Sequence, residues 1–218
     1  MDTDPSQPGQ TRRQFLKGLL LGPLLLAARP ALAARRPREL SLSFLSSSVI
    51  LVRRSAWANV SPISSKLKTA AFFRRITIHH SGALILRDTA RSSVIGELNG
   101  VLAAHRRIRY GDIGYHFVID YAGRVWEGRS LSYEGAHVSS ENEGNIGVML
   151  LGNFERQKPS QPQLETLARV SALLRRHFDI SARRVYGHRD IGASACPGRY
   201  LYPHVVALKS SSKSTSIA

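Results

Sequence analysis

The chain has 218 residues, of which 43% are hydrophobic, a size and composition that suit one globular domain with a real core. Its formal net charge is +16, which favours polyanionic partners and disfavours basic ones. The basic pairs are dispersed and no aromatic-basic motif accompanies them, so we interpret the charge as solvated surface and expect no nucleic-acid partner.

The N-terminus has the pattern of an export signal. It reads "TRRQFLKGLLLGPLLLAARPALA", with the pair Arg12 and Arg13 before an apolar stretch and a small-residue cleavage site that ends at Ala33. The alternative is a membrane anchor, but the apolar stretch is shorter than the roughly 20 residues that a spanning helix needs. We expect residues 1–33 to be a twin-arginine signal peptide, which predicts a periplasmic or secreted protein without a stable membrane anchor after cleavage.

The next residues divide into three parts. Residues 34–52 are mixed in pattern and predict a linker or an extra N-terminal segment. Residues 53–208 carry the periodic segments of a folded domain, and the polar residues 209–218 predict a disordered tail.

Strands and helices alternate within the domain. "RRITIHHSG" predicts a strand that runs into a loop, and "TARSSVIGELNGVLAAHRR" has its apolar residues at helical spacing. "IGYHFVIDYAGRVWEGR" predicts a hairpin that turns at Asp120–Gly123, and the apolar run "NIGVMLLGNF" is typical of a central strand covered on both faces. A helix with Ser160 as its N-cap, a short strand in "RRVYGHRD" and a final helix follow, so we expect an α/β fold with a central mixed β-sheet flanked by helices.

Cys196 is the single cysteine of the chain, so it cannot form an internal disulfide. In an exported protein such a cysteine indicates an intermolecular bridge, a reactive thiol or a metal ligand. His188 precedes it in "YGHRDIGASACPG", at the end of a predicted strand, and Pro197 and Gly198 favour a turn that brings the thiol back toward the imidazole. Zinc sites use such ligands, typically three from the protein when the site is catalytic.

The best source of a third ligand is the pair His79 and His80 at the end of the first predicted strand. Because side chains alternate along a strand, the two point to opposite faces and only one of them can readily bind a metal. The alternative is an ordinary pair, one histidine exposed and the other half-buried and hydrogen-bonded.

Seven motifs occur in the order seen in one known family: "RSAWA", "ITIHHSG", "GDIGYHFVID", "GRVWEGR", "GAH", "NIGVMLLGNF" and "GHRDIGASACPG". Over about residues 53–208 the chain resembles the peptidoglycan recognition proteins and phage-lysozyme-type amidases. The resemblance implies the fold of that family and zinc as cofactor, with His79, His188 and Cys196 as ligands.

The resemblance also implies roles for other residues. Tyr115, in "GYHF", corresponds to the family's catalytic tyrosine, although a purely packing role is the alternative. Ser194 stands where phage members have a catalytic lysine and many recognition-protein amidases a threonine. This departure from the family pattern argues against a general acid at position 194, but the serine hydroxyl can still donate a hydrogen bond to a tetrahedral oxygen. His137, Trp126 and Asn145 are candidate substrate-binding residues, and Arg189 and Asp190 either orient His188 or are solvated surface.

The implied activity is that of an N-acetylmuramoyl-L-alanine amidase, which cleaves the amide between the glycan lactyl group and the stem peptide, with peptidoglycan or muropeptides as partners. One alternative is a non-catalytic peptidoglycan-binding module, whose family members characteristically lack the cysteine that this chain has. A nucleic-acid binder is the other alternative, suggested by the sequence pI of about 11.0. A related cytoplasmic recycling group has an aspartate in place of Cys196, and both the cysteine and the export signal argue against that group.

Overall fold

The computed structural model describes residues 41–82 and 87–210, which belong to one compact unit. The expected signal peptide, residues 1–33, lies outside the described residues, as do residues 211–218 of the expected tail. Within the described ranges, no helix has both the length and the apolar character needed to cross a membrane.

The secondary structure follows the predicted alternation. The strands are β1 (Leu51–Val52), β2 (Arg75–His80), β3 (Phe117–Ile119), β4 (Val125–Glu127), β5 (Asn145–Leu150) and β6 (Val185–Gly187). The α-helices are α1 (Ser43–Ser46), α2 (Arg91–Arg107), α3 (Gln161–Phe178) and α4 (Tyr202–Ser210), and short 3₁₀ helices are η1 (Arg54–Ala56), η2 (Ser64–Lys66), η3 (Ala182–Arg184) and η4 (His188–Asp190).

The described strands form one mixed sheet in the order β1-β4-β3-β5-β2-β6. β3 and β4 are antiparallel, whereas β5 pairs in parallel with both β3 and β2, and β2 pairs in parallel with β6. The carboxyl ends of β2, β5 and β6 therefore meet at one edge of the sheet. This confirms the predicted α/β class with a mixed sheet.

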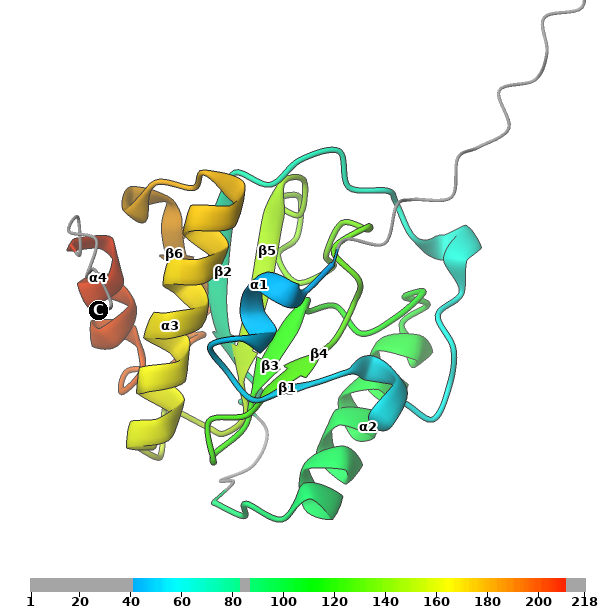
Figure 1. Ribbon diagram of the computed structural model, residues 1–218, viewed down its shortest axis with the longest axis horizontal. Helices are drawn as coiled ribbons and strands as arrows, with labels where there is room; N and C mark the ends of the chain where they lie inside the picture. Colours follow the sequence, from blue (N-terminus) through cyan, green and yellow to red (C-terminus); the bar gives the residue numbers. More distant parts are fainter. Residues whose placement is uncertain (1–40, 83–86, 211–218) are drawn as a thin grey trace, which may run out of the picture. The chain divides into compact units, whose positions relative to one another are not determined.

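Both faces of the sheet are covered (Figure 1). One hydrophobic cluster joins α1, α3 and α4 to the sheet, with side chains such as Leu45, Leu167 and Val205. The other packs Leu98 and Leu102 of α2 against the opposite face. β5 lies between them and all its residues are buried, as its continuous apolar run predicts.

Local sequence signals explain the turns and the start of α3. In the hairpin between β3 and β4, Asp120 accepts hydrogen bonds from the backbone N–H groups of Ala122 and Arg124, and Gly123 has φ +80°. α3 begins with a capping box in which the Ser160 hydroxyl accepts from the N–H of Gln163.

The domain begins earlier than residue 53. Leu42 and Leu45 are buried against the sheet, and β1 pairs with β4. The part of the expected linker that the structure describes, residues 41–52, is thus an integral part of the fold. The tail was expected from residue 209, but α4 continues to Ser210.

Candidate metal centre

Three side chains from distant parts of the chain converge at the edge where β2 and β6 end. His79, His188 and Cys196 each offer one ligand atom, and these atoms lie within 4.8 Å of one another. Nδ1 of His79 is 3.6 Å from Sγ of Cys196, and the rings of His79 and His188 have centroids 4.7 Å apart. The structure brings together the three ligands that the sequence suggested.

β2 positions the histidine pair. His79 is paired with Met149 of β5, whose side chain belongs to the α2 side of the sheet, and only 1% of its surface is exposed. Nδ1 of His80 instead accepts a hydrogen bond from the N–H of Phe154, over 3.1 Å. Only the first histidine of the pair joins the cluster, as the alternation of a strand predicts.

The loop that carries Cys196 is held by backbone contacts. The N–H of Cys196 donates to the Ser194 hydroxyl (3.1 Å) and its carbonyl accepts from the N–H of Arg189 (2.8 Å). Gly198 has φ +92°, and a Cβ atom there would lie 2.5 Å from the backbone of Phe154. Glycine is therefore required where the loop passes the sheet, and the thiol is fixed beside the two imidazoles.

Asp190 does not orient His188 as one interpretation of the sequence proposed. Its carboxylate accepts from the Gly187 N–H (2.9 Å), from the Tyr202 hydroxyl (2.6 Å) and from Lys209 (2.6 Å). These bonds fix η4 and its junction with α4. Asp190 thus positions the backbone of His188, and none of these hydrogen bonds involves the His188 imidazole.

The donor set fits zinc. With Zn–N near 2.05 Å and Zn–S near 2.3 Å, two ligand atoms of a tetrahedral site lie about 3.3–3.7 Å apart, and the 3.6 Å between His79 and Cys196 agrees with this. Burial lowers the pKa of His79 well below its ordinary value, with His137 and His188 acting in the same direction, and burial also lowers the pKa of His188. Both imidazoles are therefore in the neutral form that binds metals.

The thiol completes the set. Burial raises the pKa of Cys196 to about 12, although the hydrogen bond from the N–H of His80 opposes that effect. Without a cation beside it the sulfur is a neutral thiol, so binding a divalent metal replaces its proton.

Tyr115 lies in the segment before β3 and faces the cluster. Its ring centroid is 5.1 Å from that of His79 and 6.1 Å from that of His137. Burial raises the pKa of its phenol above the ordinary value, with nearby Cys196 acting in the same direction. The phenol is thus protonated at neutral pH and next to the candidate metal ligands.

Two of the three expected substrate-binding residues are fully buried, and the third lies beside the candidate metal ligands. Trp126 is fully buried in the α2-side core and donates its indole N–H to Asp120, so it cannot line a substrate groove. Asn145 is also fully buried, with its side chain bonded to Thr77 and to the Glu141 carbonyl. His137 is half-buried and contacts His79 directly, with 3.0 Å between His137 Nδ1 and His79 Nε2.

Sequence reasoning missed this contact between His137 and His79. The "GAH" motif signalled that His137 matters, but its partner comes from a strand 58 residues away in the chain. His80 was likewise dismissed, although its backbone N–H donates to Sγ of Cys196 over 3.3 Å.

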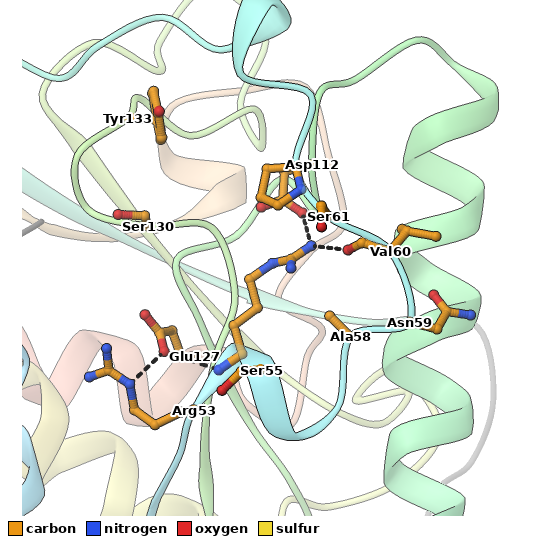
Figure 2. A pocket seen from close by; sticks show the side chains of 12 residues that line it. Arg53, Ser55, Ala58, Asn59, Val60, Ser61, Asp112, Glu127, Ser130 and Tyr133 are labelled. Atoms are coloured by element: carbon orange, nitrogen blue, oxygen red, sulfur yellow. Dashed lines mark hydrogen bonds and ion pairs between the residues drawn. The ribbon is translucent and has the colours of Figure 1, made fainter. Parts of the chain in front are cut away.

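A hollow with a volume of about 430 Å³ lies beside the segment after β1 (Figure 2). It is lined by residues 53–55 and 58–62 together with Asp112, Glu127, Ser130 and Tyr133, and none of the three candidate ligands lines it. Arg53 pairs with Glu127 (2.9 Å) and Arg54 with the buried Asp112 (2.8 Å). These ion pairs tie the segment after β1 to β4 and to the loop before β3, so we assign them a structural role.

Comparison with known proteins identifies the family of the chain. Residues 69–199 match the N-acetylmuramoyl-L-alanine amidase family. Peptidoglycan-recognition protein SC2 of Drosophila simulans is 31% identical over 72% of this chain and 85% of its own length.

Solved structures show the same fold. Drosophila peptidoglycan recognition protein SD superposes with a TM-score of 0.64 and 26% identity, covering 71% of this chain and 92% of its own. A complex of the peptidoglycan recognition proteins LCa and LCx bound to tracheal cytotoxin gives a TM-score of 0.64 and 29% identity, over 71% of this chain and 93% of that one. The chain belongs to the N-acetylmuramoyl-L-alanine amidase family, together with the peptidoglycan recognition proteins.

Proposed function

We propose that this protein is a zinc-dependent amidase that hydrolyses the bond between N-acetylmuramic acid and the L-alanine of the peptidoglycan stem peptide. The convergence of His79, His188 and Cys196 within 4.8 Å carries this proposal. A zinc ion held by these residues would act as a Lewis acid on the amide carbonyl and would lower the pKa of a water molecule to about 7.

The retained cysteine favours catalysis over binding alone. A peptidoglycan-binding module needs a groove but has no use for a thiol held beside two neutral imidazoles. Here the chain fixes the Cys196 backbone through Ser194 and Arg189, and burial keeps the histidines unprotonated. Such a donor set supports a metal hydrolase over a module that only binds.

Tyr115 is the residue that we assign to stabilising charge in the reaction. Its phenol keeps its proton because burial raises its pKa. It can therefore donate a hydrogen bond to the amide oxygen as negative charge develops there, and such donors are more effective in a site that excludes water.

Ser194 has a different primary role from the lysine or threonine of its relatives. Its oxygen accepts the N–H of Cys196 and so supports the ligand loop. The hydroxyl proton stays available, and we propose that it donates to a substrate oxygen near the metal.

Peptidoglycan or a soluble muropeptide is the proposed substrate. Support comes from the peptidoglycan-recognition relatives and from the complex of two of them with tracheal cytotoxin. We propose that the reaction takes place in the periplasm or outside the cell, after export by the twin-arginine signal in residues 1–33.

The test uses the mature chain loaded with one equivalent of zinc and a muramyl-tripeptide. Release of the free tripeptide, detected by mass spectrometry and lost in the Cys196→Ser variant, supports the amidase. Binding of the muramyl-tripeptide without cleavage by the zinc-loaded protein would instead identify a recognition module.

A further inference from the structure

We propose that His137, held by the backbone carbonyl of Asn145, is a positioning residue that fixes the tautomer of His79 so that its Nδ1 lone pair faces Cys196. This inference rests on the proposed zinc site. It replaces the substrate-binding roles that the sequence suggested for His137 and Asn145.

The proton positions follow from the chain of contacts. Nε2 of His137 is 3.2 Å from the carbonyl oxygen of Asn145, and because a carbonyl only accepts, this nitrogen carries the hydrogen. In a neutral imidazole the other nitrogen, Nδ1, is then an acceptor. It lies 3.0 Å from Nε2 of His79, which must donate.

The consequence for His79 is that its hydrogen is on Nε2 and its lone pair on Nδ1. Nδ1 is the atom that lies 3.6 Å from Sγ of Cys196. The opposite tautomer would place an N–H toward the ligand cluster and leave two lone pairs facing each other between the histidines. The metal-binding form of His79 is thus selected before a metal arrives.

The fold provides a fitted slot for the His137 ring. A Cβ atom at Gly147 of β5 would lie 2.5 Å from the ring, and the three nearest atoms all belong to His137. A Cβ atom at Gly135 would lie 2.4 Å from it. The backbone N–H of His137 donates to the side chain of Asn142, over 2.8 Å. Two glycines and an asparagine therefore hold the ring against the sheet.

A hydrogen bond to the far nitrogen of a ligating histidine orients the ring and raises its basicity, and its loss typically lowers metal affinity 10- to 100-fold. His137→Phe keeps a ring but removes the acceptor. His137→Asn restores an acceptor close to the position of Nδ1. His105→Phe is the matched control. The His105 ring is also near the site, 5.7 Å from that of Tyr115 by centroids, but it is neither a candidate ligand nor one of the contacts that link Asn145, His137 and His79.

Metal affinity is measured by titrating the apoprotein with Co²⁺ and following its visible and thiolate charge-transfer absorption, with Zn²⁺ competition. We expect His137→Phe to weaken Co²⁺ binding 10- to 100-fold, His137→Asn to recover most of it, and His105→Phe to match the parent chain. Equal affinity for His137→Phe and the parent chain would overturn the inference.

Gly147→Ala gives an independent test that keeps the histidine at position 137. The added methyl group displaces the ring, so it should weaken Co²⁺ binding in the parent chain but have a smaller effect in the His137→Asn background. Equal effects in the two backgrounds would mean that Gly147 does not act through His137, contrary to the inference.

The tautomer itself is read by two-bond ¹H–¹⁵N correlation NMR of the imidazoles in the metal-free protein. We expect His79 and His137 both to carry hydrogen on Nε2; a His79 hydrogen on Nδ1 would overturn the inference. This measurement needs no metal. Failure of the parent chain to bind zinc would overturn the proposed function, whereas the NMR result decides separately whether His137 fixes the tautomer of His79.

Discussion

The backbone N–H of His80 donates a hydrogen bond to Sγ of Cys196 over 3.3 Å, so the strand that carries one candidate metal ligand also supports another. A sulfur that accepts an N–H is better able to carry negative charge. The histidine doublet therefore serves the site twice, through the imidazole of His79 and through the main chain of His80.

Metal binding should release one proton from Cys196. The pKa of this thiol is raised to about 12 by burial, whereas the pKa values of His79 and His188 are lowered, so near neutral pH only the cysteine must lose a proton. Zinc affinity should rise about tenfold for each pH unit between 7 and 8. Competition titrations across this range measure the slope.

The Cys196→Ser variant gives the corresponding control. It should lose at least about 100-fold in zinc affinity, because an alcohol does not replace a thiolate at neutral pH. A slope near zero in the parent chain, or near-normal zinc content in the variant, would show that the thiol is not a ligand.

Removal of the Tyr115 hydroxyl should affect turnover and spare the metal. We expect Tyr115→Phe to lower kcat by about 100-fold or more, as loss of one hydrogen-bond donor to a developing oxyanion does, with unchanged zinc content. Steady-state kinetics on a muramyl-tripeptide and elemental analysis of the same samples provide the check. Tyr110→Phe is the matched control, and a comparable loss in both variants would remove the catalytic role.

Acid should destabilise the fold through His116. Its Nδ1 accepts the N–H of Gly147 and its Nε2 donates to the carbonyl of Tyr133, both at 3.0 Å, so a second proton has no acceptor. Burial lowers its pKa from 6.5 to about 4. The unfolded chain takes up the proton first, so this stabilisation is complete above about pH 6.5 and declines as pH falls toward 4.

At pH 5 the loss should be about 2 kcal/mol of unfolding free energy from this histidine. Urea unfolding at pH 7 and pH 5 should therefore show a smaller difference in His116→Asn than in the parent chain. The exposed His204 provides the control variant, His204→Asn. Identical pH dependence in His116→Asn and the parent chain would contradict this prediction.

The ion pair of Arg54 and Asp112 should contribute to stability. Asp112 is 1% exposed, so Arg54→Met leaves a buried carboxylate without its cation, which costs about 3 kcal/mol. Lys68→Met breaks a pair whose lysine side chain is 69% exposed and should cost less than about 1 kcal/mol. Urea unfolding compares the two, and equal effects would show that burial does not decide the outcome.

Export should depend on the arginine pair. Arg12→Lys combined with Arg13→Lys should keep the full chain in the cytoplasm, because the twin-arginine route recognises both residues. Immunoblots of periplasmic and cytoplasmic fractions report the outcome. Export of the double variant at the level of the parent chain would argue for another route.

Much of the fold could be predicted from sequence because its signals are local. The period of the apolar residues indicated α2 and α3, Ser160 and Gln163 formed the expected capping box, and the turn after Asp120 formed the expected hairpin. For residues 41–52 the sequence left a linker and an extra N-terminal segment as alternatives, because their pattern is short and their place in the core depends on contacts with distant α3 and β4.

The candidate site could likewise be predicted only in part. His79, His188 and Cys196 were identified from motif resemblance, and the alternation of β2 correctly separated His79 from His80. The prediction that Trp126 lines a groove is contradicted by its burial in the core. A motif gives a residue's place in the chain but not the side of the sheet on which its ring lies. The burial of Asn145 was within reach of sequence reasoning, since it begins a strand expected to be covered on both faces.

The parallel pairing of β2 with β6 also sets the time at which the site can form. His79 and Cys196 are 117 residues apart in the chain, so closing the loop between them without the sheet would carry a large entropic penalty. A chain in which β6 has not yet docked presents scattered donors rather than a chelate. The proposed metal site therefore forms late in folding, once the central sheet is complete.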